Sequence, residues 1–290
     1  MSTVLKNNKK QLFDRNKLLR SRIRAKSVNL ENKIYTQISN DISNRLSEIN
    51  RLFDSVLIIT KNRNFESFNI PIKDKSNPCI LSPTYPFNFN NIIFEDEEML
   101  PFNSNKFDLI ISDLFLHTSN NLQESLKKIR DLLKPDGLMI ATMFGSDTLF
   151  ELKYSLISAE EKITGLTYPR VNPFIDIKNA GDILYSSGFK LCVADNYKVQ
   201  LMHEHPLELI KLIRSMGENN YINLKKPPIK RKVWNMATHL LKEKSTNPNL
   251  IPSTFEIITL TGWKFHENQQ KPLAPGSAKI YLKDVLKNSS

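Results

Sequence analysis

Glycine and cysteine are scarce in this 290-residue chain, and each shortage excludes a class of protein. Eight glycines and fifteen prolines are too few for a collagen-like or low-complexity chain. The two cysteines, Cys79 and Cys192, lie far apart and form no CxxC pair, so we expect reduced thiols, as in an intracellular protein, rather than a disulfide framework. The histidines show no HExxH or HxxxH spacing. We therefore predict no metal site.

Long hydrophobic runs are missing as well. No apolar run reaches the roughly 18–20 residues that a membrane-spanning helix needs, so we expect no transmembrane segment and a cytoplasmic location. Hydrophobic residues make up 40% of the chain and charged residues 24%, which favours a packed globular core. Residues 1–26 are basic but lack the apolar centre of a secretory signal, and we interpret them as part of the folded domain rather than as a targeting segment.

The chain carries a basic excess, with 41 Lys and Arg against 30 Asp and Glu and a net charge of +11. Such an excess is typical of proteins that bind nucleic acid or acidic proteins. The lysines are scattered, however, in pairs such as Lys9–Lys10 and Lys127–Lys128. The joint richness in Lys, Asn and Ile also follows from an AT-rich genome. We do not expect a nucleic-acid partner, and an RNA-modifying enzyme stays open only as an alternative.

Strands alternate with helices in the middle of the chain. Residues 107–112 and 138–144 are short apolar runs of the buried parallel-strand type, and residues 121–133 place their leucines on one helical face. Between them, Pro135 ends the helix and Gly137 is expected to supply a positive φ in a turn over 134–137. This order predicts a βαβ unit, and hence a parallel sheet covered by helices.

The flanking segments extend this pattern until residue 197. From there to residue 253 the alternation stops, which predicts a helical cap inserted before the last strand. We therefore divide the chain into an N-terminal helical segment (1–54) and an α/β domain (55–290) with the cap at 197–253. The remaining expected elements are strands at 55–60, 91–94, 189–193 and 254–263, and helices at 30–51, 147–164 (with Asp147 as N-cap), 176–187, 206–216 and 230–244.

In open α/β sheets, ligands bind beyond the carboxyl ends of the strands. The candidate residues are thus those that end or follow each expected strand. Ser112, Asp113 and His117 come at and just after the strand at 107–112, so the topology points them toward the mouth of a pocket. A structural role, as a capping or partly buried histidine, is the alternative for His117.

Several strings resemble a known family. FDLIIS (107–112), LH (116–117) and LLKPDG (132–137) resemble the second half of class I S-adenosylmethionine (SAM)-dependent methyltransferases. Other strings are similar to one branch, which holds the mitochondrial complex I assembly factor, related to the biotin-synthesis methyltransferases, and its alphaproteobacterial relatives. The resemblance covers nearly the whole chain. The branch strings are LFDRN (12–16), MFGSDTLFEL (143–152), NPF (172–174), MGENN (216–220) and TGWKFHE (261–267).

The resemblance implies a Rossmann-like α/β fold with a mostly parallel seven-stranded sheet, an antiparallel last strand and a SAM pocket over the first four strands. For the assembly-factor branch it implies hydroxylation of an arginine in a respiratory complex I subunit, which would be the protein partner. For the biotin branch it implies methylation of a malonyl thioester.

One departure from the family concerns the cofactor. The first strand normally ends in an acidic, glycine-rich loop (D-x-G-x-G-x-G), because glycines let the backbone approach the ligand. The equivalent stretch here, LIITKNRNF (57–65), has neither glycine nor acid, and the side chains of Lys61, Asn62 and Arg63 would crowd the ligand. The ribose-binding acid after the second strand cannot be identified either, with Asp74 the nearest residue. We predict that SAM binding is weakened or lost.

Family positions still define candidate residues. Asp96 falls where the family has an acid near the adenine, with a solvated acidic turn as the alternative. Glu218 lies in the cap and could contact substrate, with a helix C-cap as the alternative, and His266 follows the last strand and is expected at the active-site rim. The full candidate set is His117, Glu218 and His266 for catalysis and Ile59, Thr60, Asn62, Asp96, Ser112 and Asp113 for the cofactor.

Three functions remain open from sequence. The first is a SAM-dependent methyltransferase-like enzyme that modifies a respiratory complex subunit. The second is a non-catalytic assembly or binding protein that has lost SAM. The third is an RNA-modifying methyltransferase, whose affinity for RNA would fall steeply with salt.

Overall fold

The computed structural model describes residues 11–25, 33–61, 68–73, 77–82, 92–93, 98–245, 247 and 249–269. Its centre is a seven-stranded sheet with the order β3-β2-β1-β4-β5-β7-β6. The strands β1 to β5 run parallel, and β7 is antiparallel to both β5 and β6. The predicted Rossmann-like α/β fold is confirmed. The strands are β1 Val56–Thr60, β2 Cys79–Leu81, β3 Ile92–Ile93, β4 Phe107–Asp113, β5 Leu133–Phe144, β6 Lys190–His203 and β7 Ile251–Trp263.

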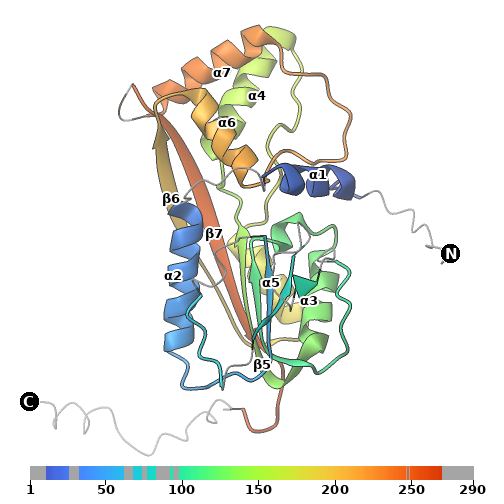
Figure 1. Cartoon of the computed structure of the whole chain (residues 1–290). Coiled ribbons are helices and arrows are strands. Elements are labelled where there is room, and N and C mark those ends of the chain that lie inside the picture. Colours follow the sequence, from blue (N-terminus) through green and yellow to red (C-terminus); the bar gives the residue numbers. More distant parts are fainter. Residues whose placement is uncertain are drawn as a thin grey trace, which may run out of the picture.

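Helices cover both faces of the sheet and one end of it (Figure 1). One face is covered by α2, the other by α3 and α5, and α4, α6 and α7 form a cap beyond the upper end of the strands, with α1 beside it. A short 3-10 turn, Leu116–Thr118, follows β4. The helices are α1 Arg15–Ala25, α2 Lys33–Ser47, α3 Leu122–Leu132, α4 Phe150–Thr164, α5 Ile177–Ser186, α6 Pro206–Ser215 and α7 Arg231–Glu243.

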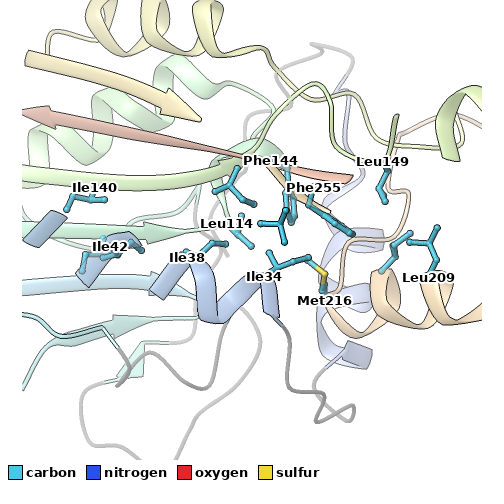
Figure 2. Close-up of a cluster of buried hydrophobic side chains, with 14 of the residues drawn as sticks. Ile34, Ile38, Ile42, Leu114, Ile140, Phe144, Leu149, Leu209, Met216 and Phe255 are labelled. Carbon is cyan, nitrogen blue, oxygen red and sulfur yellow. The ribbon is translucent and has the colours of Figure 1, made fainter. Parts of the chain in front are cut away.

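The core divides into two apolar layers because side chains alternate along a strand. In β1, Ile58 belongs to the layer that α2 covers, while Leu57 and Ile59 belong to the layer under α3 and α5. Each fully buried side chain of this kind stabilises the fold by roughly 1.5–3 kcal/mol. Figure 2 shows the first layer continuing from α2 through the strands to the cap, by way of Ile34, Ile38, Ile42, Leu114, Ile140, Phe144, Phe255, Leu149, Leu209 and Met216.

The last two strands are longer than the sequence predicted. The strand expected at 189–193 runs from Lys190 to His203, and the strand expected at 254–263 begins at Ile251. They pair with each other from Lys190↔Trp263 to His203↔Ile251, whereas β5 pairs with β7 only as far as Phe144↔Ile257. The upper half of β6 was missed because it is a half-exposed edge strand with few buried positions. The segment between the two strands therefore spans 204–250 rather than 197–253.

Two local predictions were wrong. The positive φ near 134–137 belongs to Asp136 (61°) and not to Gly137, and this segment is part of β5, where the pairing with β4 shifts register. Asp147 is not the N-cap of α4, because the helix begins at Phe150 after Leu149, whose φ is 57°. The Asp147 carboxylate instead lies 2.6 Å from Lys198 Nζ.

Other expectations concern the whole chain. Cys79 and Cys192 are both free thiols. Within the described ranges, no helix is both long and apolar enough to cross a membrane. The expected helices agree with the observed ones to within a few residues at each end. The division into an N-terminal segment and an α/β domain remains a prediction, although α2 belongs to the main core.

Candidate functional site

Polar side chains gather where β1, β4 and β5 end. Thr60 pairs with Asp113 across β1 and β4, and Asp113 pairs with Thr142 across β4 and β5. The Asp113 carboxylate accepts hydrogen bonds from Thr60 Oγ1 (3.0 Å) and Thr142 Oγ1 (3.3 Å). Burial raises the pKa of Asp113 to about 6, although these hydrogen bonds and Lys61 oppose the rise. The fold thus places one buried carboxyl group at the end of β4, between the ends of β1 and β5.

A buried ion pair lies directly beyond the end of β1. Lys61 Nζ donates to Glu218 Oε1 of the segment after α6, and the two side chains are 5% and 4% exposed. Burial lowers the pKa of Lys61, against the opposing effect of Glu218. Burial alone would raise the pKa of Glu218, but Lys61 and His117 hold it well below its usual range. Glu218 is therefore ionised and joins the cap to the sheet.

The second oxygen of Glu218 has partners of its own. Glu218 Oε2 lies 3.1 Å from His117 Nε2 and accepts a hydrogen bond from the Tyr221 hydroxyl at 2.5 Å. Burial lowers the pKa of His117, because the interior disfavours its charged form more strongly than Glu218 favours it. The His117 ring lies between Phe144 and Phe174, with ring centroids 4.9 and 5.7 Å away. His117 is thus a buried group that helps to hold the Glu218 carboxylate in place.

The basic helix α1 contributes a further buried cation. The Arg22 guanidinium lies over the Phe115 ring, 4.4 Å from its centroid, and its Nη2 donates to Thr118 Oγ1 at 3.1 Å. Sequence reasoning missed Arg22 because it occurs in a run of basic residues that is typical of a solvated face. Tyr221 was missed as well, although it directly follows the MGENN string that drew attention to Glu218.

A cavity of about 180 Å³ lies between the cap and the strand ends. Its walls are mostly apolar side chains from α4, α6, α7, the end of β5 and the first half of β7, and its polar lining includes Arg170, Arg214, Glu218, Asn219 and Asn220. Trp234 and Phe144 are among its aromatic walls. The cavity can receive an apolar or mixed side chain beside a buried carboxylate.

The structure brings together four of the predicted residues, namely Thr60, Asp113, His117 and Glu218. Ile59 and Ser112 are fully buried, and Ile59 belongs to the apolar layer beneath α3 and α5. The hydroxyl of Ser112 has no hydrogen-bond partner among the described residues. Asn62 and Asp96 lie outside the described residues, so their predicted cofactor contacts stay predictions.

His266 does not join this group, which corrects its expected place at the rim. Since β7 is antiparallel, its last residue Trp263 pairs with Leu138 in the first half of β5 and with Lys190 at the start of β6. The residues after Trp263 therefore emerge at the opposite edge of the sheet. There the His266 ring accepts a hydrogen bond from the Asn268 backbone N–H at 3.2 Å.

The residues at the end of β1 do not fit SAM in the manner usual for the fold. A SAM-binding strand end needs glycines so that the backbone can approach the ligand. Here Thr60 and Lys61 carry full side chains, and Lys61 with Glu218 forms a buried pair just beyond that end. Among the residues that the structure describes, no group of three or more His, Cys, Asp or Glu side chains could hold a metal ion.

Comparisons with known proteins agree with the fold. A family model described as "Methyltransferase domain" matches residues 78–141. The YcgJ protein of Bacillus subtilis has a solved structure that covers 78% of this chain and 99% of its own, with a TM-score of 0.51 and 12% identity. That likeness shows the fold alone.

Two curated relatives are closer in sequence. The mitochondrial arginine-hydroxylase NDUFAF5 of Mus musculus is 37% identical over 67% of this chain and 57% of its own length, so the chain spans little more than half of that relative. The putative methyltransferase RP459 of Rickettsia prowazekii is 33% identical over 64% of this chain and 81% of its own length. The chain therefore belongs to the methyltransferase-like family of the rickettsial protein and is homologous to NDUFAF5.

Proposed function

We propose that this protein acts on a protein partner as a methyltransferase-fold binding or assembly protein, without binding SAM in the usual way. The observation that carries the proposal is the buried Lys61–Glu218 ion pair at the end of β1. In a conventional member of the fold, this end of the sheet belongs to the cofactor. Here the space beside it is taken by a contact between sheet and cap.

The energetic argument follows from burial. SAM could lie over the end of β1 only after Lys61 and Glu218 had separated or moved together. Leaving one member of a buried pair without its partner costs about 3–5 kcal/mol, which corresponds to a loss in affinity of roughly 150- to 5000-fold. A cofactor that a relative binds at micromolar concentration would then bind at about millimolar concentration or not at all.

The protein partner is inferred from the relatives. Several are named arginine-hydroxylases, so their substrate group is an arginine, and the sequence strings imply a respiratory complex I subunit as the partner here. His117 and Glu218 are the candidate residues on the partner side, since Glu218 also lines the cavity. Thr60, Ser112 and Asp113 are the candidates for any remaining cofactor contact. The cytoplasmic location stays a prediction, because these relatives are named mitochondrial.

Calorimetric titration with SAM tests the proposal. We expect no saturable heat from the wild-type protein at submillimolar SAM. The double variant Lys61→Gly/Glu218→Gln removes the ion pair and is expected to bind SAM no worse than the wild type, whereas the surface variant Lys190→Gly should match the wild type. Thermal unfolding of the same samples shows that each is folded. Micromolar binding to the wild type would overturn the proposal and favour a SAM-dependent enzyme.

A further inference from the structure

A second, strongly basic cleft lies outside the cluster around Glu218. It has a volume of about 730 Å³ and lies between α1 and the segment that ends α6. Figure 1 shows α1 beside the lower end of α6. The residues that line the cleft are Lys17, Arg20, Ser21, Arg24, Arg214, Asn219 and Asn220, which include four cations and no carboxylate.

The walls of this cleft are fixed to each other. Ser21 Oγ donates to the Gly217 carbonyl at 3.1 Å, and Asn219 Nδ2 donates to Ser21 Oγ at 2.5 Å. At Gly217, where φ is 71°, a Cβ would lie 3.1 Å from the Arg22 Cα. Only glycine permits so close an approach of α1 at this backbone conformation. The cleft is therefore a defined feature of the fold and not a gap beside a loose helix.

The cations of the cleft differ in how far they are neutralised. Lys17 has Asp14 at 3.7 Å. Arg20 and Arg214 are exposed, and neither forms an ion pair with a carboxylate of the described residues. They stand on opposite walls, one on α1 and one in the last turn of α6. An anionic ligand between them would meet positive charge from both sides.

The cleft adjoins the apolar cavity under the cap. Arg214, Asn219 and Asn220 line both of them. A chain lying along the cleft could thus place one side chain in the cavity beside Glu218, while its neighbouring side chains remain among the cations. This continuity is what a peptide requires and a small anion does not.

The lining favours a peptide over RNA. Proteins that bind single-stranded RNA stack bases on aromatic side chains, and the lining of this cleft includes none. The exposed side chains next to its cations on α1 are aliphatic, namely Leu19 (36% exposed) and Ile23 (46%). We propose that the cleft between α1 and α6 binds an acidic segment of a protein partner, whose carboxylates meet Arg20 and Arg214. This inference names the kind of partner and so rests on the proposed function.

The test is fluorescence anisotropy at low salt with a labelled peptide of alternating Glu and Leu, and with its Gln and Leu counterpart. We expect saturable binding of the acidic peptide alone. The reversal Arg20→Glu/Arg214→Glu should weaken it roughly tenfold or more, because like charges replace complementary ones. The control Lys190→Glu/Lys242→Glu makes the same change in net charge at exposed positions outside the lining and should stay within about twofold.

Three results would overturn the inference. They are equal weakening by both double variants, no binding of the acidic peptide to the folded wild type, and tighter binding of a labelled oligouridine that depends on the same two arginines. The neutral variant Arg20→Gln/Arg214→Gln serves as a second test in case the charge-reversed variant misfolds. Its affinity for the acidic peptide is expected to lie between those of the wild type and the charge-reversed variant. SAM titration is a separate measurement. If the acidic peptide does not bind, the proposal about the Lys61–Glu218 ion pair still stands, and if SAM binds tightly, the proposal about the cleft can still be tested.

Discussion

The ends of β1 and β5 lie at the same edge of one sheet, but side chains occupy the first end and a glycine occupies the second. At the end of β1, two full side chains follow each other and Lys61 forms a buried pair with Glu218. At the end of β5, Gly145 remains a glycine, and an added Cβ would lie 2.8 Å from Glu256 Cγ. There the Glu256 carboxylate accepts a hydrogen bond from the Asp147 backbone N–H at 2.8 Å. The end of β1 has side chains at Thr60 and Lys61, whereas at Gly145 an added side chain would collide with Glu256.

The difference separates the scaffold from the cofactor site. The family strings in β4 and β5 include fully buried residues such as Leu109 and Leu133, and this core must be filled whatever ligand is bound. In conventional members of the fold the end of β1 serves the cofactor, and in this chain that end forms a buried ion pair with the cap. The fold of the core thus does not by itself determine which ligand the strand ends hold.

The largest expected effect comes from breaking the ion pair at the end of β1. Lys61→Met leaves Glu218 buried beside an apolar side chain, and the free energy of unfolding should fall by about 3–5 kcal/mol. Lys61→Met/Glu218→Gln removes both charges and should recover most of that loss. Urea denaturation measures both variants. A single variant that costs less than about 1 kcal/mol would show that water reaches this pair, and the contrast between the strand ends would fail.

Asp113 stands between the two ends and gives a pH test. Its pKa of about 6 in the folded protein exceeds its ordinary value of 3.8. The stability that the protonated Asp113 contributes is therefore fully present below about pH 4 and is lost as the pH rises through 6. Asn does not titrate. Relative to the wild type, Asp113→Asn should therefore gain up to about 3 kcal/mol between pH 4 and pH 7, at about 1.4 kcal/mol per pKa unit. Unfolding free energies that run parallel across this range would show that Asp113 is solvated.

A smaller effect is expected at the end of β5. Gly145→Ala would push the Glu256 side chain from its hydrogen bonds, and we expect a loss of about 1–3 kcal/mol in the free energy of unfolding. Gly181→Ala is the matched control, because it lies within α5 with Ala194 Cβ at an ordinary 3.4 Å and should be neutral or stabilising by about 0.5–1 kcal/mol. Thermal unfolding compares the two. Equal unfolding temperatures for the two variants would mean that the end of β5 tolerates a side chain at position 145.

Much of the fold could be predicted from the sequence. The strands β1, β4 and β5 are buried on both faces, so each appears as a continuous apolar run, and α3 shows one apolar face. The upper half of β6 could not be predicted in this way. Its half-exposed side chains follow no simple apolar run, and only pairing with β7 makes it a strand.

The candidate site could be predicted only in part. The rule that ligands bind at the carboxyl ends of strands found Thr60, Asp113 and His117. Lys61 was noticed for its bulk, but its partner Glu218 is 157 positions away in the chain, and no local pattern links the two. The misplacement of His266 was avoidable, since the residue after an antiparallel strand emerges at the opposite edge from the site.

The long pairing of β6 with β7 has a consequence for chain connectivity. His203 and Ile251 are antiparallel partners, and a two-residue type I′ turn is enough to join two such positions. Residues 204–250 could thus be exchanged for a hairpin turn without altering the order or direction of any strand. Such a shortened chain would keep its topology but lose Glu218, so Lys61 would have no carboxylate partner from the cap. The cap could thus be removed without changing the order of the strands, yet Lys61 at the end of β1 depends on a carboxylate that the cap supplies.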